Sequence, residues 1–348
     1  MTTTRLRTRV AVGAALALAF GIPPGASARV FDCIDPGERI PVVFVHGLLG
    51  SADVWTSPHG NGTALFQAVA SLPGFVADVF DYGRFSDRWV THESIAPALA
   101  GRIKCLAEAS HRGYGPGRVV VVGHSMGGLA IRQALGEKGV GEAVGLAVTI
   151  ASPHKGSGMA RLAYPGSGPV YGVVGRPGER LVWSLLGAVC ALPGELLPGA
   201  ALEDRSLCGL LRYADTEAGP AMVKGSAELA ALPQFPPALP VRAVAAQLPV
   251  SVPFLWPVTV RMGDFVVGVD SATNGHAFRG RYEDRGGGEF VRICEPVGLG
   301  SLLTLALEET TEIPCEHRGV LRDLDVIADV TGSLKRWAEA EVMASGRV

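Results

Sequence analysis

The chain has 348 residues, of which 48% are hydrophobic and 18% are charged. This hydrophobic fraction excludes intrinsic disorder, which requires low hydrophobicity and high net charge, and the length suffices for one large domain or two ordinary ones. The formal net charge of −2 offers no basic surface to a nucleic acid, so we expect no nucleic-acid partner.

The first thirty residues have the pattern of a secretory signal peptide. Three arginines within residues 5–9 form a positive start, an apolar run occupies residues 10–20, and small residues precede a cleavage site after Ala28. The run is shorter than the roughly 20 residues of a transmembrane helix, which argues against the alternative of an uncleaved membrane anchor. We expect residues 1–28 to be removed and residues 29–348 to be secreted, either to the medium or to the cell envelope.

All six cysteines follow the predicted signal peptide. An even number of cysteines in an exported chain indicates disulfides, and sequence proximity favours the pairs Cys190–Cys208 and Cys294–Cys315, which leaves Cys33 for Cys105. The sequence contains no C-x-x-C pair and no metal-ligand spacing among the histidines. We therefore expect neither a metal nor a cofactor.

Strand-like and helical segments alternate along the first 150 residues of the chain. The predicted strands are Ile40–Val45, Phe75–Phe80, 118–122 and 145–150. The predicted helices are one that Ser94 caps, with apolar residues Ile95, Leu99, Ile103 and Leu106 at helical spacing, and one over residues 126–135. This alternation implies βαβ units around a parallel sheet and hence an α/β fold.

The pattern changes between about residues 156 and 257, where glycine and proline are frequent. We expect short helical pieces around residues 181–189 and 227–232, a returning strand at 241–246, and a closing helix at 326–342. A long loop with little regular structure in a compact domain is usually functional, so we predict a lid or cap insertion over residues 156–257. Its apolar face could comprise Trp183, Leu185 and Leu186, although ordinary packing explains these side chains equally well.

The sequence Gly-His-Ser-Met-Gly-Gly occupies residues 123–128, after four valines and before a stretch that can form a helix. The spacing Gly123-x-Ser125-x-Gly127 fits a nucleophile elbow, the sharp strand-to-helix turn that raises a serine hydroxyl above a sheet. Glycine is required on both sides because a side chain there would collide with the neighbouring strand or helix. We predict Ser125 as a nucleophile rather than an idle serine in a glycine-rich turn.

A second motif, His-Gly-Leu-Leu-Gly at residues 46–50, follows the first predicted strand. We expect the backbone N–H of Leu48, with that of Met126, to form an oxyanion hole for the charge that develops on a carbonyl oxygen. His46 is expected to brace this loop by hydrogen bonding rather than to act as a base.

These two motifs resemble those of the lipases and esterases of the α/β-hydrolase superfamily. Residues 151–157, Ala-Ser-Pro-His-Lys-Gly-Ser, are similar to the Pro-His-x-Gly turn of bacterial triacylglycerol lipases. The resemblance covers most of residues 40–155 and the C-terminal part more thinly. It implies a mostly parallel eight-stranded sheet flanked by helices and a catalytic triad in the chain order serine, acid, histidine.

The resemblance also implies the acid of the triad. Residues 261–268 resemble the family's Gly-Asp-x-Val-Val-Pro turn and indicate Asp264, although Gly268 stands where proline is usual. Asp270 and Asp284 remain alternatives. In this role a carboxylate fixes the tautomer of the histidine and stabilises its positive form.

Of the eight histidines, only His276 and His317 follow Asp264 in the sequence. His317 lies in a loop just before the predicted final helix, where the family has its histidine, whereas His276 lies beside an Asn-Gly turn typical of a surface loop. We therefore predict His317 as the base, and a Cys294–Cys315 bridge would hold its loop in place.

Together these features predict a secreted serine hydrolase of the α/β-hydrolase fold that cleaves carboxylic esters through an acyl-enzyme, with the triad Ser125, Asp264 and His317. The expected partner is a small-molecule or lipid ester, with transient contact with a lipid interface. Thioesterase or acyltransferase chemistry uses the same residues and remains an alternative. A non-catalytic binding protein on the same scaffold is the alternative from a different class.

Overall fold

The computed structural model of the chain describes residues 33–113, 115–158, 216–253, 257–298 and 315–345, together with positions 182, 185 and 188. The predicted signal peptide, the Cys190–Cys208 pair and the lid residues Trp183 and Leu186 lie outside the described residues.

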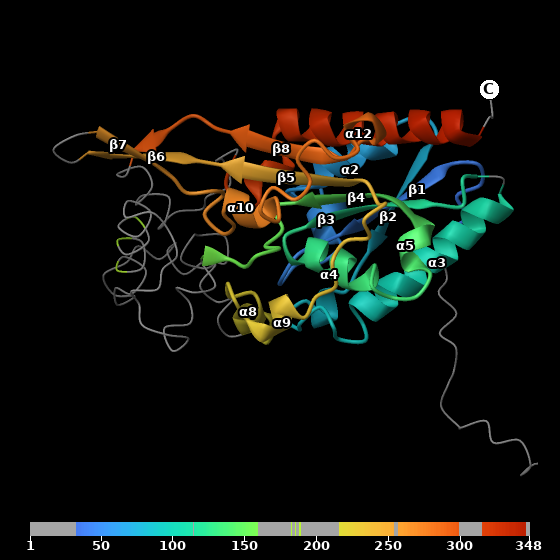
Figure 1. Ribbon diagram of the computed structural model, residues 1–348, viewed down its shortest axis with the longest axis horizontal. Helices are drawn as coiled ribbons and strands as arrows, with labels where there is room; N and C mark the ends of the chain where they lie inside the picture. The colour runs from blue at the N-terminus through green and yellow to red at the C-terminus, as the bar shows by residue number, and fades with distance from the viewer. Residues whose placement is uncertain are drawn as a thin grey trace, which may run out of the picture. The chain divides into compact units, whose positions relative to one another are not determined.

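Six parallel strands form the central sheet, in the order β2-β1-β3-β4-β5-β8 (Figure 1). The first four are β1 (Ile40–Val45), β2 (Phe75–Phe80), β3 (Val119–His124) and β4 (Val144–Ile150). The other two are β5 (Val241–Gln247) and β8 (Gly288–Ile293). The first five strands match the predicted ones to within two residues at each end.

Within the described residues the main sheet has six strands, whereas the family resemblance implies eight. Three further strands form a separate small sheet, β6 (Pro249–Pro253), β7 (Pro257–Arg261) and β9 (Val297–Gly298). Strand β6 pairs with β7 in antiparallel fashion and begins and ends with proline. Because proline has no N–H to donate to a sheet, these strands suit a short peripheral pairing better than a central position.

Two hydrophobic cores cover the two faces of the sheet, because successive side chains of a strand point to opposite faces. Val42 and Phe44 of β1 belong to the core that also contains residues of α2 (Thr63–Ala70) and α12 (Leu324–Ser345). Val43 and Val45 belong to the opposite core. Its helices are α3 (Ala96–Arg112), α4 (Met126–Ala134) and α5 (Val140–Ala143), which lie on the other side of the sheet (Figure 1).

Helix α3 begins at Ala96, and Ser94 does not cap it, which corrects the prediction. The N-cap is Ile95, and the backbone N–H of Ser94 donates to Nδ1 of His92 at 3.2 Å. Pro97 in the first turn lacks an N–H group, so one of the donors that a cap would satisfy is missing. The predicted apolar positions of this helix are all fully buried, at Ile95, Leu99, Ile103 and Leu106.

Shorter helices connect these elements. They are α1 (Asp53–Thr56), α8 (Ala218–Ala221), α9 (Ala227–Ala230), α10 (Val269–Ala272) and the 3₁₀ helices η1 (Gly83–Phe85), η7 (Glu283–Arg285) and η8 (Gly319–Leu321). Helix α9 confirms the helical piece predicted at 227–232. The described positions of the piece predicted at 181–189, which are 182, 185 and 188, are also helical.

Two of the predicted disulfides are present, Cys33–Cys105 and Cys294–Cys315. The first ties the segment before β1 to α3, and the second ties the residue after β8 to the loop that contains His317. Among the described helices, none combines the length and the hydropathy that a membrane span requires.

Candidate active site

Ser125 lies at the sharp turn between β3 and α4. Its backbone has φ = 54° and ψ = −129°, a region that a non-glycine residue occupies only when its surroundings hold it there. The N–H of Ser125 donates to the carbonyl of Ile150 at 2.9 Å, and its own carbonyl accepts the N–H of Gly128 at 3.0 Å. These bonds to β4 and α4 hold the turn in place.

The two glycines of the elbow lie where no side chain fits. A Cβ atom at Gly123 would lie 2.7 Å from both the backbone nitrogen of Gly128 and Cδ1 of Ile131, within α4. A Cβ atom at Gly127 would collide with the carbonyl oxygen of Val45, at the end of β1. The predicted collisions with the helix and the neighbouring strand are therefore confirmed.

Ser125, His317 and Asp264 form a hydrogen-bonded chain. Nε2 of His317 lies 2.9 Å from Oγ of Ser125, and Nδ1 of His317 lies 2.9 Å from Oδ2 of Asp264. A carboxylate only accepts hydrogen bonds, so Nδ1 carries the proton and Nε2 is free to accept the serine hydroxyl. All three side chains are buried, although they come from loops after β3, after β7 and before η8.

The structure brings Asp264 to the histidine and places the two alternative acids elsewhere. Oδ1 of Asp264 accepts the backbone N–H groups of Val266 at 2.9 Å and Val267 at 2.6 Å, which leaves Oδ2 for His317. The Asp270 side chain is 63% exposed and faces Nζ of Lys155 at 3.8 Å. Asp284 is exposed in η7.

The alternative base, His276, is not near the serine hydroxyl. Its Nδ1 lies 2.8 Å from Oε2 of Glu289, and its side chain is partly exposed. Of the two histidines that follow Asp264, His317 is therefore the one that contacts Ser125.

The loop of His317 is held by side chains whose contribution the sequence did not reveal. Nε2 of His124 donates to the backbone carbonyl of His317 at 2.8 Å. Burial lowers the pKa of His124 well below its ordinary value, so this ring is neutral. Oε1 of Glu316 accepts the N–H of Gly319 at 2.5 Å, and burial raises the pKa of Glu316. No local pattern in the sequence indicates the contact of His124, because its partner is 193 residues away.

The turn at residues 151–157 holds the loop of the acid. The hydroxyl of Ser157 donates to the carbonyl of Val266 at 2.6 Å, and that of Ser271 donates to the carbonyl of Gly156 at 2.7 Å. The backbone N–H of Lys155 donates to the hydroxyl of Ser271 at 3.0 Å. This turn served only as a mark of resemblance in the sequence, and in the structure it positions the segment around Asp264.

The loop that follows β1 lies directly against the serine. A Cβ atom at Gly47 would lie 2.8 Å from Cβ and 3.3 Å from Oγ of Ser125. The N–H of Leu49 donates to the carbonyl of Ser86 and that of Gly50 to the carbonyl of Gly47, both at 3.1 Å. Among the described residues, none accepts the N–H of Leu48.

The second predicted oxyanion donor, Met126, is the first residue of α4. The first N–H groups of a helix have no acceptor within the helix, and the helix dipole places partial positive charge at this end. The amides of Leu48 and Met126 are thus both available next to Ser125.

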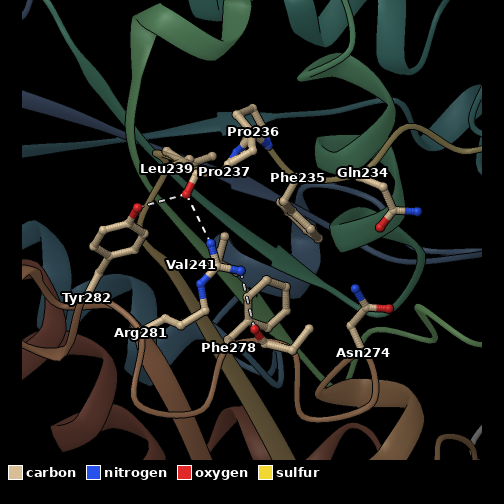
Figure 2. Close-up of a pocket in the computed structure, with 11 residues that line it drawn as sticks. Gln234, Phe235, Pro236, Pro237, Leu239, Val241, Asn274, Phe278, Arg281 and Tyr282 are labelled. Carbon is tan, nitrogen blue, oxygen red and sulfur yellow. Dashed lines mark hydrogen bonds between the residues drawn. The ribbon is translucent and has the colours of Figure 1, made fainter.

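Outside this site, Figure 2 shows a pocket of about 180 Å³. It is lined by residues within 234–241 and 274–282, among them Phe235, Phe278 and Arg281, and by none of the predicted site residues. The residues that the structure describes contain no group of histidine, cysteine, aspartate or glutamate side chains that could hold a metal ion.

A family model described as alpha/beta hydrolase fold matches residues 40–167. This range includes Leu48, Ser125 and Met126 and ends before Asp264 and His317. The comparison with curated proteins finds no match.

Several solved structures are similar to this chain at low identity. The mature form of lipase BlEst2 from Bacillus licheniformis has 16% identity and a TM-score of 0.42, with 79% of this chain and 89% of that chain covered. Lipase B from Aspergillus fumigatus has 13% identity and a TM-score of 0.43, with 88% and 63% covered. Esterase RhEst1 from Rhodococcus sp. ECU1013 has 16% identity and a TM-score of 0.38, with 83% and 92% covered.

Proposed function

From the α/β-hydrolase fold of this chain, we propose that the protein is a serine hydrolase of carboxylic esters, with acyl lipids as its substrate class. One observation carries the proposal, the hydrogen-bonded chain from Oγ of Ser125 through both ring nitrogens of His317 to Oδ2 of Asp264. A base in contact with the hydroxyl, itself oriented by a carboxylate, is the arrangement that activates a serine nucleophile.

In the first half of the reaction, Oγ of Ser125 attacks the carbonyl carbon of the ester while Nε2 of His317 takes the hydroxyl proton. The carbonyl oxygen becomes an oxyanion, and the N–H groups of Leu48 and Met126 stabilise it. One such donor typically lowers the barrier by about 3 kcal/mol. His317 then returns the proton to the leaving alcohol, and an acyl-serine remains.

In the second half, water attacks the acyl-serine and His317 takes a proton from it. The same two amides stabilise the second oxyanion, and Ser125 recovers its proton as the carboxylic acid leaves. Asp264 keeps its charge throughout and stabilises the positive imidazolium that forms in each half.

A fluorophosphonate probe tests the proposal, because it reacts covalently with activated serines. We expect labelling of the wild-type protein and none of Ser125→Ala. The matched control is Ser333→Ala, which removes another buried serine hydroxyl, in α12, and should label normally. Folded wild-type protein that takes no label would instead support a non-catalytic binding protein.

The substrate class is tested with p-nitrophenyl esters of increasing acyl chain length. An enzyme for acyl lipids should turn over long-chain esters at least as well as acetate or butyrate esters. A marked preference for acyl thioesters would favour a thioesterase, and transfer of the acyl group to an added alcohol in preference to water would favour an acyltransferase. Both alternatives use the same three side chains.

Export after removal of residues 1–28 is also part of the proposal. The disulfides Cys33–Cys105 and Cys294–Cys315 support it, because such bonds persist in oxidising compartments. Expressed with its full sequence in a bacterial host, the protein should appear outside the cytoplasm with Arg29 as its first residue. Retention in the cytoplasm with residues 1–28 attached would contradict export.

The predicted insertion at 156–257, apart from the strands β5 and β6 within it, is proposed as a cover over the acyl site that opens at a lipid interface. Its length and its frequent glycines and prolines support this interpretation. The rate should then rise steeply once the substrate exceeds its solubility and forms an interface. A rate that follows ordinary saturation through the solubility limit would contradict this part of the proposal.

A further inference from the structure

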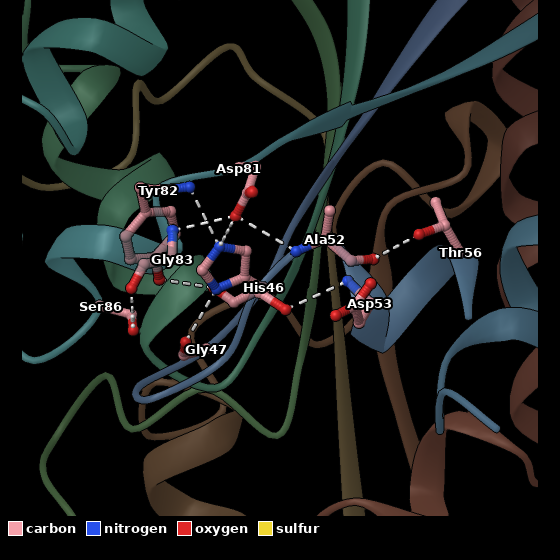
Figure 3. Close-up of polar contacts among 10 residues, drawn as sticks. His46, Gly47, Ala52, Asp53, Thr56, Asp81, Tyr82, Gly83 and Ser86 are labelled. Carbon is pink, nitrogen blue, oxygen red and sulfur yellow. Dashed lines mark hydrogen bonds and ion pairs between the residues drawn. The ribbon is translucent and has the colours of Figure 1, made fainter.

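Asp81 connects the two ends of the loop that carries Leu48 (Figure 3). Its Oδ1 accepts the backbone N–H of Ala52 at 3.2 Å and lies 3.1 Å from Nε2 of His46. It also accepts the N–H of Gly83 at 2.9 Å, which fixes the carboxylate to its own loop. A single oxygen therefore contacts the residue before and the residue after the segment 47–51.

The sheet explains why these groups meet. Strands β1 and β2 are parallel neighbours in which Val45 is paired with Phe80. The residues that follow them, His46 and Asp81, therefore leave the sheet side by side at its carboxyl edge. The two residues are 35 positions apart in the sequence, so no local pattern indicates their contact.

The contacts of His46 define its protonation state. Nδ1 lies 3.0 Å from the carbonyl of Gly47, which can only accept, so Nδ1 carries the proton. Nε2 then accepts the backbone N–H of Tyr82 at 3.1 Å. Burial lowers the pKa of His46 and favours this neutral form, whereas the neighbouring Asp81 acts in the opposite direction.

Tyr82 makes two further contacts with His46. Its hydroxyl donates to the carbonyl of His46 at 2.6 Å, and its ring stacks on the imidazole with 4.0 Å between ring centroids. His46 is consequently held through its ring and its backbone carbonyl. At the far end of the loop, Ala52 is the N-cap of α1 and donates its N–H to Asp81.

The loop between these anchors does not hold its own conformation. Leu49, next to the predicted donor, has φ = 52° and a half-exposed side chain. A non-glycine residue in this region costs about 1–3 kcal/mol and persists only when its surroundings impose it. Within the loop, the turn from Gly50 to Gly47 supplies a single backbone hydrogen bond.

We propose that Asp81 is a positioning residue of the oxyanion hole. It directs the N–H of Leu48 at the substrate oxygen because one of its carboxylate oxygens accepts the backbone N–H of Ala52, at the far end of the loop, and that of Gly83, after β2. This inference rests on the proposed function. The Asp81 side chain is 52% exposed, and it contacts the backbone of Ala52 and Gly83 rather than a member of the candidate triad.

The test measures kcat and KM on one p-nitrophenyl ester, with kcat expressed per active site titrated to completion with the fluorophosphonate. Asp81→Ala removes the anchor. Ala52→Pro removes the same hydrogen bond from its donor side, and the native φ of −52° suits proline. Each change should lower kcat at least tenfold and alter KM less than threefold, because the oxyanion exists only in the transition state.

Two comparisons separate positioning from a general structural role. Asp81→Asn retains an acceptor oxygen, so it should recover kcat to within about threefold of wild type and remains informative should Asp81→Ala fail to fold. The double variant of Asp81→Ala with Ala52→Pro should be no slower than the slower single variant, because both remove one bond. The matched control is Asp87→Ala, an exposed acid of the same segment that pairs only with its neighbour Arg88, and it should match wild type.

The inference is overturned if Asp81→Ala and Ala52→Pro each keep kcat per titrated site within twofold of Asp87→Ala. A rise in KM at unchanged kcat would overturn it as well, because it would indicate a role in substrate binding. A wild-type protein that neither labels nor hydrolyses esters would instead overturn the proposed function itself.

Discussion

The three side chains of the candidate triad come from three different loops, and hydrogen bonds hold each of these loops in place. Val266 and Val267 direct the carboxylate of Asp264, His124 holds the backbone of His317, and Ile150 holds that of Ser125. Catalytic groups need to lie within about 0.5 Å of the productive geometry, so these supporting bonds matter as much as the three side chains. Single substitutions should therefore distinguish residues that contribute to kcat from residues that only lie near the triad.

Asp264→Asn should lower kcat on an ester by about 10³-fold to 10⁴-fold. An amide can present its NH₂ group to Nδ1 of His317, which favours the wrong tautomer and leaves the imidazolium without a negative partner. Asp270→Asn is the control, since this exposed carboxylate faces Lys155, and it should change kcat less than twofold. Equal losses in the two variants, measured by steady-state kinetics, would contradict the assignment of Asp264.

Gly47→Ala should impair turnover while the protein stays folded. The added methyl group would lie 2.8 Å from Cβ of Ser125, closer than carbon atoms approach, so the loop and its Leu48 amide must shift. We expect kcat to fall at least tenfold, in line with the loss of one oxyanion donor. Gly158→Ala, where the methyl group meets no atom within 4 Å, should be within twofold of wild type. An unchanged kcat in Gly47→Ala would mean that this loop is not held against the serine.

At the scale of elements, the parallel sheet places the functional loops at one edge. Ser125 follows β3, and His46 and Asp81 follow β1 and β2, so the carboxyl ends of three adjacent strands supply the proposed nucleophile and the loop packed against it. This is the edge at which open α/β sheets generally bind ligands. The loop of His317 is tied to the end of β8 by the Cys294–Cys315 bond.

The two described disulfides should differ in what they do for catalysis. From sequence separations of 21 and 72, the Cys294–Cys315 bond should contribute about 3 kcal/mol and the Cys33–Cys105 bond about 4 kcal/mol to stability. Replacing both Cys294 and Cys315 with serine should also lower kcat per folded molecule, because Cys315 is two residues from His317.

The matched variant lacks the Cys33–Cys105 bond, which is remote from the triad loops in the sequence and ties a segment before β1 to α3. It should lose stability in urea denaturation and keep kcat per titrated site. If the two double-serine variants lose kcat equally, the Cys294–Cys315 bond has no particular role in positioning His317.

At the scale of the whole molecule, the two cores bury several histidines that the proposed chemistry does not protonate. His154 is buried, with Nε2 3.2 Å from Oγ1 of Thr149, and burial together with the Arg132 guanidinium lowers its pKa to about 3. His46 and His124 are also buried, and burial lowers the pKa of each. Such histidines make the folded protein sensitive to acid.

The direction of this effect follows from proton uptake. Below pH 6.5 the unfolded chain protonates His154, while the folded protein leaves it neutral until about pH 3, so the free energy of unfolding falls as the pH decreases through this window. For His154 alone the loss at pH 5 is about 2 kcal/mol relative to pH 7. His154→Gln should reduce the difference in unfolding free energy between pH 7 and pH 5 by about that amount.

The control for this measurement is His59→Gln, which changes an exposed histidine and should leave the difference between pH 7 and pH 5 as in wild type. Urea denaturation at the two pH values provides both quantities. A His154→Gln protein with the same pH dependence as wild type would show that His154 does not contribute to the acid sensitivity.

Much of the fold was predictable from local pattern. The apolar run at Ile40–Val45 matched β1, because a strand covered on both faces must be apolar throughout. The prediction at Phe75–Phe80 matched β2, although this strand lies at the sheet edge, is only partly buried and contains Asp78. The elbow around Ser125 was predictable for a similar reason, since only glycine fits where β3, α4 and β1 meet. The predicted cap at Ser94 was wrong, because α3 begins at Ala96 and Pro97 in its first turn has no N–H group for a cap to satisfy.

The sequence by itself determined the buried strands and the strained turn at Ser125, because each depends on neighbours within a few residues or on steric limits that apply in any fold. Only the tertiary structure placed Asp264 rather than Asp270 against His317, gave His124 its contact with His317, and brought Asp81 to the loop of Leu48. These contacts join residues far apart in the chain, and their partners follow from which strands are adjacent and where each loop crosses the sheet edge, which no local spacing encodes.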